Sequence, residues 1–230
     1  MKKYLVPIVF TLVIIALLGF AIKASVSSSN DAKTDTSPST TELTAAQKDR
    51  LKEGQTTGPK DAKVVVSEFA DFQCPACKQY ETAMRQIRQT YPDQVLVVFK
   101  HFPLYPQPHK NAQIAAIASE SAANQGKFWE YHDKLYDTQD DWAELNDPKS
   151  KFAEYAQGLG LDVERFKKDL DAEYGKDRIE SDKNFGKELD IKGTPTIYIN
   201  GVQFNPQQDG GLDGLLAKVK AAVEQAGSGQ

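Results

Sequence analysis

The chain has 230 residues, of which 40% are hydrophobic and 26% charged, and its formal net charge at pH 7 is −4. Surfaces that bind nucleic acid or anionic membranes carry clustered basic residues, so this slightly acidic chain is expected to bind neither. A structural zinc site needs four Cys or His ligands in spaced pairs. The two cysteines and three histidines here lack that pattern, so we expect no metal and no other cofactor.

The N-terminus begins with an apolar stretch, residues 4–22, behind Lys2 and Lys3. Its 19 residues are enough to cross a bilayer as a helix. A cleavable signal peptide begins in the same way, but the best small-residue cleavage site, ending at Ala24, is interrupted by Lys23. We therefore expect residues 1–24 to be an uncleaved membrane anchor with the rest of the chain outside, and a cleaved signal is the alternative.

Residues 25–57 are predicted to be a linker. From Ser25 to Thr44, 11 of 20 residues are Ser or Thr, a composition that cannot form a packed core. A short helix fits within residues 44–57, where Leu51 is the one sizeable apolar residue. We expect the folded domain to span about residues 58–226, followed by a flexible tail at residues 227–230.

The folded domain opens with a predicted strand, helix and strand. Residues 62–70 and 95–99 are nearly continuous apolar runs, which are typical of strands covered on both faces. Between them, apolar residues recur at helical spacing from Lys78 to Gln89. Such a unit closes as a right-handed crossover with parallel strands.

Both cysteines lie in Cys74-Pro75-Ala76-Cys77, between the first strand and the helix. This is the carboxyl end of a strand, where open α/β sheets place their active sites. A structural disulfide explains the pair poorly, because its stabilisation grows with loop length and this loop is very short. We predict a redox dithiol: Cys74, with Pro75 in the first helical turn, is the exposed nucleophile of lowered pKa, and Cys77 is the resolving thiol.

Glu68 stands six residues before Cys74, within the first predicted strand. An unpaired buried carboxylate is costly or stays protonated, which suggests a functional reason for its presence. It could give or take the proton of Cys77 during thiol exchange. The alternative is a solvated position on an edge strand.

A long helical block follows, over about residues 108–190. Apolar periodicity predicts five helices, at residues 109–125, 127–138, 148–158, 162–174 and 178–189.

The C-terminal part of the domain is predicted to be a hairpin and a helix. Residues 196–199 and 202–204 are its strands around the Asn200-Gly201 turn, and residues 212–226 form the final helix. The segment Gly193-Thr194-Pro195-Thr196 enters the hairpin at a point where a proline normally ends a strand, and tight turns of this kind are where cis X-Pro bonds occur.

Four features together resemble the DsbA-type thiol:disulfide oxidoreductases of the thioredoxin superfamily, most closely their membrane-tethered bacterial branch. The features are Cys74-Pro75-Ala76-Cys77, the preceding Ala70-Asp71-Phe72-Gln73, Lys100-His101-Phe102-Pro103-Leu104, and the Gly193–Thr196 turn. The resemblance covers about residues 58–226. It implies an α/β, thioredoxin-like fold with an inserted helical subdomain.

The resemblance also implies a role for each site residue. Cys74 attacks, Cys77 resolves, and Glu68 matches the buried acid of the family. A cis Thr194-Pro195 bond packs against the disulfide, and the Thr194 backbone pairs with substrate as a short added strand.

One position departs from the family pattern. The best-known oxidants of the family carry histidine immediately before the second cysteine, where this chain has Ala76. Loss of that donor should make the disulfide less oxidising.

We expect a monomeric extracytoplasmic enzyme that donates its disulfide to reduced secreted or membrane proteins and is reoxidised by a membrane quinone-linked protein. A disulfide reductase or isomerase is the first alternative, although isomerases of the superfamily usually carry a dimerisation domain and residues 25–57 cannot form one. The second alternative, from a different class, is a tethered chaperone or peptide-binding module. Such a module would keep its activity without the cysteines.

Overall fold

The computed structural model describes residues 42–229, which belong to one folded unit. The expected anchor or signal, residues 1–24, and the linker as far as residue 41 lie outside the described residues. Among residues 42–229, no helix is both long and apolar enough to span a membrane.

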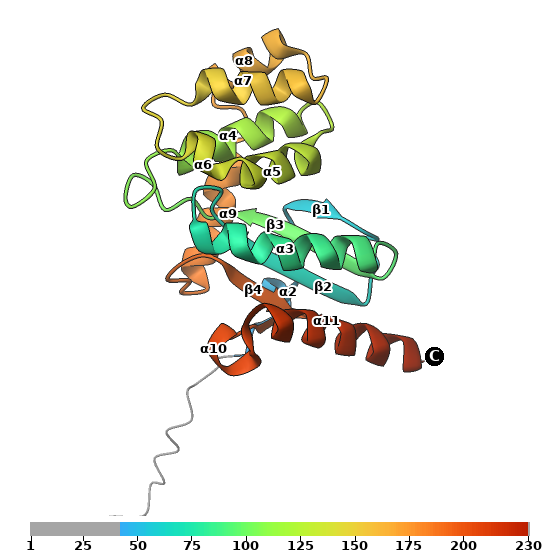
Figure 1. The fold of residues 1–230 in the computed structure, drawn as a ribbon. Helices are drawn as coiled ribbons and strands as arrows, with labels where there is room; N and C mark the ends of the chain where they lie inside the picture. Colours follow the sequence, from blue (N-terminus) through green and yellow to red (C-terminus); the bar gives the residue numbers. More distant parts are fainter. Residues whose placement is uncertain (1–41, 230) are drawn as a thin grey trace, which may run out of the picture. The chain divides into compact units, whose positions relative to one another are not determined.

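A five-stranded mixed sheet forms the centre of the unit, in the order β1-β3-β2-β4-β5 (Figure 1). Strands β2 and β3 are parallel, as predicted, and pair from Val64 with Val95 to Ala70 with His101. All other neighbouring strands are antiparallel. The strands are β1 (Gln55–Thr57), β2 (Val64–Ala70), β3 (Val95–His101), β4 (Thr196–Ile199) and β5 (Val202–Gln203).

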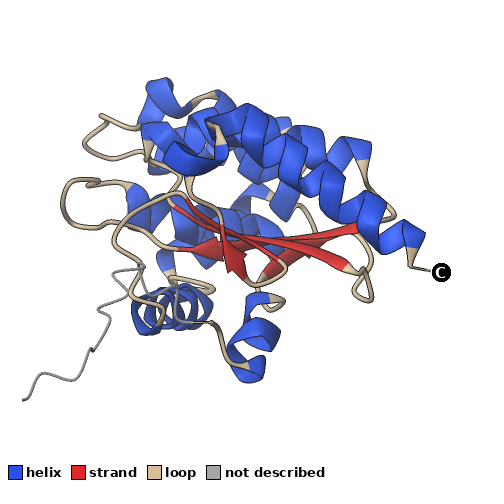
Figure 2. Ribbon diagram, turned by 90° about the horizontal axis from the view of Figure 1, so that it is seen from below, coloured by secondary structure: helices blue, strands red, loops and turns tan. Residues whose placement is uncertain are grey.

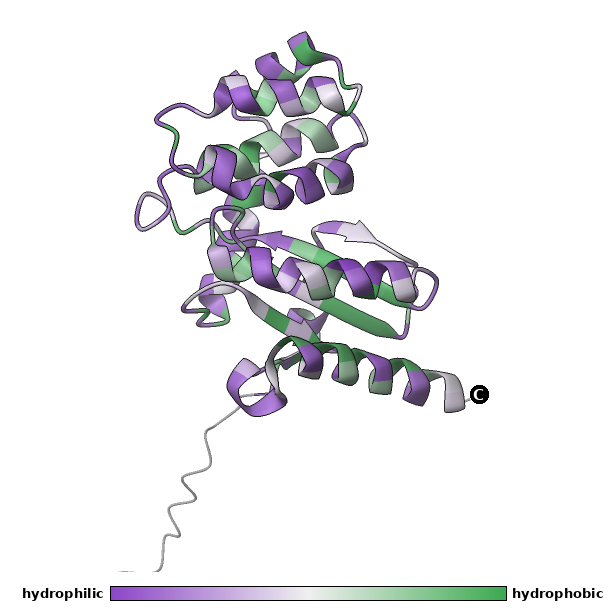
Figure 3. Ribbon diagram, viewed as in Figure 1, coloured by the Kyte–Doolittle hydropathy of each residue, from purple (hydrophilic) through white to green (hydrophobic). Residues whose placement is uncertain are grey.

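Helices cover both faces of this sheet (Figure 2). On one face, α3 (Pro75–Thr90) and α11 (Gly211–Ser228) share an apolar cluster with Val64 and Val66 of β2. On the other face, α2 (Ala45–Leu51) and α9 (Lys176–Glu188) contribute to a cluster around Phe69. Because both faces are covered, β2 and β3 are apolar along most of their length, as their colours show (Figure 3).

The predicted helical block is confirmed between β3 and β4. Its largest fully buried side chains, including Tyr131, Trp142, Phe152 and Phe166, form a core that extends to Phe99 of β3. The helices before α9 are α4 (Ala112–Ala123), α5 (Phe128–Asp137), α6 (Gln139–Trp142), α7 (Lys149–Gly158) and α8 (Val163–Asp171). The fold is therefore thioredoxin-like, with a helical subdomain inserted in the central connection.

The folded unit begins earlier than the sequence predicts. Residues 45–57, expected within the linker, hold α2 and β1. Thr44 starts α2 through a capping box with Gln47, and β1 pairs with β3. A seven-residue helix with one buried side chain, Leu51, gives too weak a periodicity to extend the domain boundary.

Smaller differences occur near the C-terminus. The tail was expected to be flexible from residue 227, but α11 extends through Ser228. No proline interrupts the helix before that point. The four-residue α10 (Pro206–Asp209) was not predicted. The Asn200-Gly201 turn is confirmed, and both residues have the positive φ that a two-residue hairpin turn requires, 50° and 81°.

Candidate active site

The Cys74-Pro75-Ala76-Cys77 segment begins α3, as predicted. Cys74 is the N-cap residue and Pro75 occupies the first helical turn. The backbone N–H of Cys74 donates to the carbonyl oxygen of Asp71 at 3.1 Å, which closes the turn between β2 and α3. Both cysteines are free thiols, so the structure represents the reduced form.

The two thiols are more enclosed than the sequence suggests. Cys77 is 0% exposed, and Cys74, which we expected to be the exposed nucleophile, is only 6% exposed. The cause is the turn before Pro195: the Cys74 Sγ donates to the carbonyl oxygen of Thr194 at 3.4 Å. Cys74 remains the more accessible of the two, but substrate must reach it at an edge of this turn.

The surroundings of the two thiols shift their pKa values in opposite directions. A hydrogen bond from the Cys77 thiol lowers the pKa of Cys74 to about 6, helped by the Thr194 hydroxyl and the backbone N–H groups of Cys77 and Ala76, although burial opposes the shift. Burial raises the pKa of Cys77 well above its ordinary value, and the charges of Cys74 and Glu68 add to the effect. This is the direction that the sequence predicts for a nucleophile and a resolving thiol.

The Thr194-Pro195 bond is cis, as the resemblance implies. The Thr194 hydroxyl oxygen is buried and has no hydrogen-bond partner among the described residues. In the thiol form, Cys74 donates to the Thr194 carbonyl, whereas in the thiolate form the hydroxyl can donate to the sulfur. Thr194 therefore offers a partner to either protonation state of Cys74.

Glu68 lies in the interior of the sheet. Strand β2 runs between β3 and β4, where Glu68 is level with Phe99 and Ile197, and its side chain is 3% exposed. The alternative of a solvated edge position is therefore wrong. Burial raises the pKa of Glu68 to about 8, and the nearby charge of Glu81 contributes in the same direction.

Three polar residues that sequence reasoning missed fasten the helical subdomain to this turn. Gln139 Nε2 donates to the carbonyl oxygens of Phe72 and Cys74, at 2.7 and 3.0 Å. Gln73 Nε2 donates to the Ala143 carbonyl at 2.7 Å, while its Oε1 accepts from the Asn111 N–H at 2.6 Å. Isolated amide side chains give no periodic or motif signal, so their role is visible only in three dimensions.

A second polar cluster joins α3 to α5. Glu81, His132 and Asp133 present potential metal-ligand atoms within 4.8 Å of one another. Arg88 Nη2 already donates to both Glu81 and Asp133, and Arg85 Nε lies 3.2 Å from Glu81. Because these guanidinium groups already neutralise the carboxylates, we assign no metal to the cluster.

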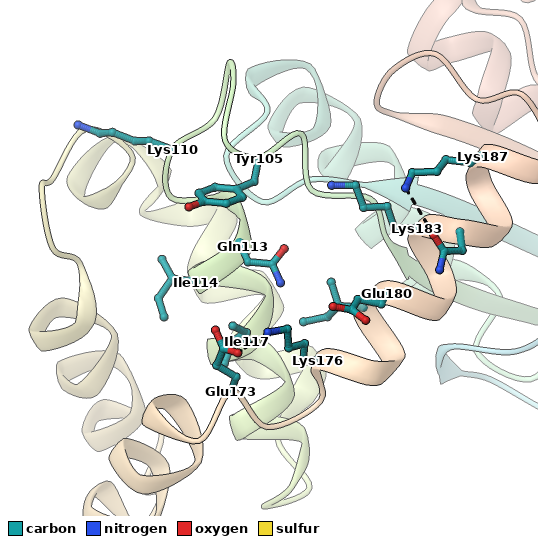
Figure 4. Close-up of a pocket in the computed structure, with 12 residues that line it drawn as sticks. Tyr105, Lys110, Gln113, Ile114, Ile117, Glu173, Lys176, Glu180, Lys183 and Lys187 are labelled. Atoms are coloured by element: carbon teal, nitrogen blue, oxygen red, sulfur yellow. Dashed lines mark hydrogen bonds and ion pairs between the residues drawn. The ribbon is translucent and has the colours of Figure 1, made fainter.

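A groove of about 660 Å³ lies between α4, α9 and the loop that carries Tyr105 (Figure 4). Ile114 and Ile117 of α4 line one side, and Lys183 and Lys187 of α9 line the other. The cysteines and the Thr194-Pro195 turn are not among its lining residues, so the groove is separate from the thiol site.

The sequence model of the thioredoxin family matches residues 50–218. The sodium/proton antiporter NhaA 3 of Salinispora tropica is 38% identical over 169 residues, which cover 74% of this chain and 24% of that protein. The chain thus spans about a quarter of the length of such antiporters. The Probable disulfide bond formation protein D of Bacillus anthracis is 33% identical over 168 residues, covering 67% of this chain and 73% of that protein.

Solved structures with the same fold include oxidised BdbD from Bacillus subtilis, with a TM-score of 0.65 and 23% identity over 80% of this chain and 96% of that chain. Another is α-DsbA1 from Wolbachia pipientis, with a TM-score of 0.62 and 19% identity over 74% of this chain and 91% of that chain.

Proposed function

The chain belongs to the DsbA-type thiol:disulfide oxidoreductases of the thioredoxin superfamily, and from that membership we propose that it is an extracytoplasmic oxidant that introduces disulfides into reduced secreted or membrane proteins. The observation that supports the direction of exchange is the position of Cys74 as the N-cap residue of α3, where the Cys77 thiol and the backbone N–H groups of Cys77 and Ala76 lower the pKa of Cys74 to about 6. A stabilised thiolate favours the reduced enzyme and therefore makes its disulfide a stronger oxidant.

In the proposed reaction, a substrate thiolate attacks the Cys74 sulfur of the Cys74–Cys77 disulfide. The bond between the cysteines breaks, a mixed disulfide forms, and Cys77 leaves with the electron pair. A second substrate thiolate then attacks the substrate sulfur of the mixed disulfide and releases Cys74 as a thiolate. The substrate loses two electrons and the enzyme gains them, and a membrane quinone-linked partner reoxidises the enzyme.

Glu68 is proposed to supply the proton that Cys77 takes up as it leaves. With a pKa of about 8, Glu68 is largely protonated at neutral pH. Its position in β2 is on the same face as Val64 and Val66, which pack against α3, the helix that carries Cys77.

The backbone of Thr194 is proposed to hold the substrate as a short added strand. In the reduced enzyme the Thr194 carbonyl accepts from the Cys74 thiol. Neither the disulfide nor the thiolate of Cys74, which predominates above its pKa of about 6, has a proton to donate, so in both forms this carbonyl is open to a substrate N–H.

The reduction potential against glutathione tests the direction of exchange. An oxidant should equilibrate between about −120 and −180 mV, the range from DsbA to protein disulfide isomerase, whereas about −270 mV, the value of thioredoxin, would favour the reductase alternative. A protein that exchanges no thiol with glutathione would contradict the proposed function.

Single cysteine variants test the roles of the two thiols. When Cys74 of Cys77→Ser is first activated as a mixed disulfide with glutathione, client thiolates should displace the glutathione and accumulate as mixed disulfides visible on non-reducing gels, because Cys77 is no longer present to attack them. Cys74→Ser should trap few clients, since Cys77 is fully buried. Equal trapping by both variants would overturn the roles, and client binding that persists without either cysteine would favour the chaperone alternative.

A further inference from the structure

Asp71 places a buried carboxylate beside the nucleophile. Its side chain is 0% exposed, and its backbone oxygen accepts from the Cys74 N–H. Its two carboxylate oxygens accept from the backbone N–H groups of Gln73 and Leu104, at 2.7 and 2.9 Å. Because Asp71 and Cys74 belong to the same hydrogen-bonded turn, a negative charge on Asp71 is expected to oppose ionisation of the Cys74 thiol.

His109 is the cation positioned against this carboxylate. Its Nδ1 lies 2.6 Å from Asp71 Oδ2, its side chain is 14% exposed, and its Nε2 makes no hydrogen bond within residues 42–229. The loop between β3 and α4 is fixed on both sides of His109, by Leu104 bonding to Asp71 and by Asn111 bonding to Gln73. The imidazole is thus built into the active-site turn, although 35 residues separate it from Cys74 in sequence.

The other cations near this turn are less suited to the role. Lys183 of α9 interacts with Asp71 only through longer-range charge, since no ion pair joins them in the described part of the chain. Lys110 is directed to Glu144, with its Nζ 3.8 Å from the carboxylate. The hydrogen bond to Asp71 raises the pKa of His109, and the charges of Asp71 and Cys74 raise it further, against the opposing effect of burial.

We propose that His109 is a positioning residue for the nucleophile: its imidazolium neutralises the buried Asp71 carboxylate and thereby favours the Cys74 thiolate. The inference rests on the proposed function and deepens it. Position 76, where a donor could act directly on the thiolate, holds alanine in this chain. The positive charge of His109, in the β3–α4 loop, instead favours the Cys74 thiolate indirectly, by neutralising Asp71.

The matched variants are His109→Asn and Lys110→Gln. The first keeps an N–H donor for Asp71 and removes the positive charge, and the second removes one positive charge from the next residue of the same loop. Thiolate ultraviolet absorbance of each reduced protein is followed against pH. We expect the Cys74 pKa to rise by about half to one unit in His109→Asn and to stay unchanged in Lys110→Gln.

The equilibrium with glutathione at pH 7 gives a second measurement. A rise of half to one unit in the Cys74 pKa lowers the equilibrium constant for reduction of the His109→Asn disulfide about threefold to sixfold. This corresponds to a reduction potential roughly 14 to 23 mV more negative. A histidine that served only to hold the loop would leave both quantities unchanged when asparagine preserves the hydrogen bond.

The native protein offers a test that needs no variant. Because the charges of His109 and Cys74 are coupled, the His109 ring, followed by nuclear magnetic resonance, should titrate at higher pH in the reduced protein than in the disulfide form. Identical titration in both forms, or a folded His109→Asn protein with unchanged thiolate pKa, would overturn the inference. These readouts need no client protein, so they remain decisive if the native enzyme fails the glutathione or trapping tests of the proposed function.

Discussion

Cys74 and Cys77 begin the same helix, yet their surroundings give them opposite acidities. Hydrogen-bond donors converge on Cys74, whereas Cys77 is enclosed by apolar side chains and nearby negative charge. The proposed roles of nucleophile for Cys74 and resolving thiol for Cys77 thus rest on the deeper burial of Cys77, one helical turn further along α3.

The first prediction concerns alkylation of the reduced protein. The rate at Cys74 should rise with pH and reach half its maximum near pH 6, because only the thiolate reacts. Cys77 should remain unmodified until the protein is denatured. Mass spectrometry after timed iodoacetamide treatment measures both, and a midpoint near the unperturbed pKa of about 8.5 would contradict the assignment.

The second prediction concerns position 76. Ala76→His should make the disulfide more oxidising, because a charge-assisted hydrogen bond to the Cys74 thiolate contributes about 1 kcal/mol or more. For a two-electron couple this is roughly 20 to 30 mV in the reduction potential. Ala76→Gln is the uncharged control, and a potential equal to or below that of the native protein would mean that residue 76 does not face the thiolate.

The third prediction uses the buried acid. The pKa of Glu68 is about 8 in the folded protein, against an ordinary value of 4.5 for an exposed glutamate, so between these limits the folded state holds the proton more tightly than the unfolded state. The free energy of unfolding should therefore fall as pH rises through this window, by about 1.4 kcal/mol for each unit that separates the two pKa values. In Glu68→Gln this loss is absent.

Denaturant unfolding of the disulfide form, in which no thiol titrates, measures this effect. Between pH 5 and pH 8.5 the stability difference between Glu68→Gln and the native protein should shift by a few kcal/mol in favour of the variant. A difference that does not depend on pH would show that Glu68 is not the titrating group.

At the scale of elements, the contact between α3 and α5 depends on charge as well as on packing. Arg88 is 12% exposed, bonds to Glu81 and Asp133, and lies with its Cζ 4.7 Å from the centroid of the Trp129 ring. It therefore joins the helix that carries the cysteines to the inserted subdomain.

The fourth prediction is that Arg88→Met lowers the free energy of unfolding by about 3 kcal/mol, because Glu81 loses a principal partner while remaining buried. Lys149→Met, which breaks an exposed ion pair with Asp171, serves as the control and should change stability by less than about 1 kcal/mol. Urea unfolding measures both, and equal small effects would mean that apolar contacts alone hold α5 to α3.

The elements that could be predicted from sequence are those with long apolar patterns. The parallel β2 and β3, the helix after the cysteines and the helical block have such patterns, since each buries a continuous face. Short elements such as β1, α6 and α10 depend on caps and partners that lie far away in sequence, and they were missed.

The same distinction holds within the site. Cys74, Cys77 and Glu68 were identified because their residue types are unusual where they stand. The near-complete burial of Cys74 could not be predicted, because it is caused by a turn 120 residues away. The contributions of Gln139 and His109 likewise arise from tertiary contacts.

At the scale of the whole molecule, the fifth prediction concerns residues 1–24. If residues 1–24 are an uncleaved anchor, as we propose, the full-length protein should remain with the membrane fraction through washes with high salt and alkali, because burial of 19 apolar residues does not depend on charge. A protein shortened to residues 42–230 should be released without detergent. Recovery of a native form that begins near Ser25 would instead identify a cleaved signal.

The presence of only two cysteines in the sequence affects how the protein forms its own disulfide. In a chain with four cysteines, three disulfide connectivities are possible, so oxidation can produce non-native pairs. This sequence has two cysteines, and they allow a single intramolecular disulfide. Every copy can therefore form this bond before, during or after folding and reach the same product. The enzyme therefore needs no disulfide isomerase to correct its own intramolecular disulfide.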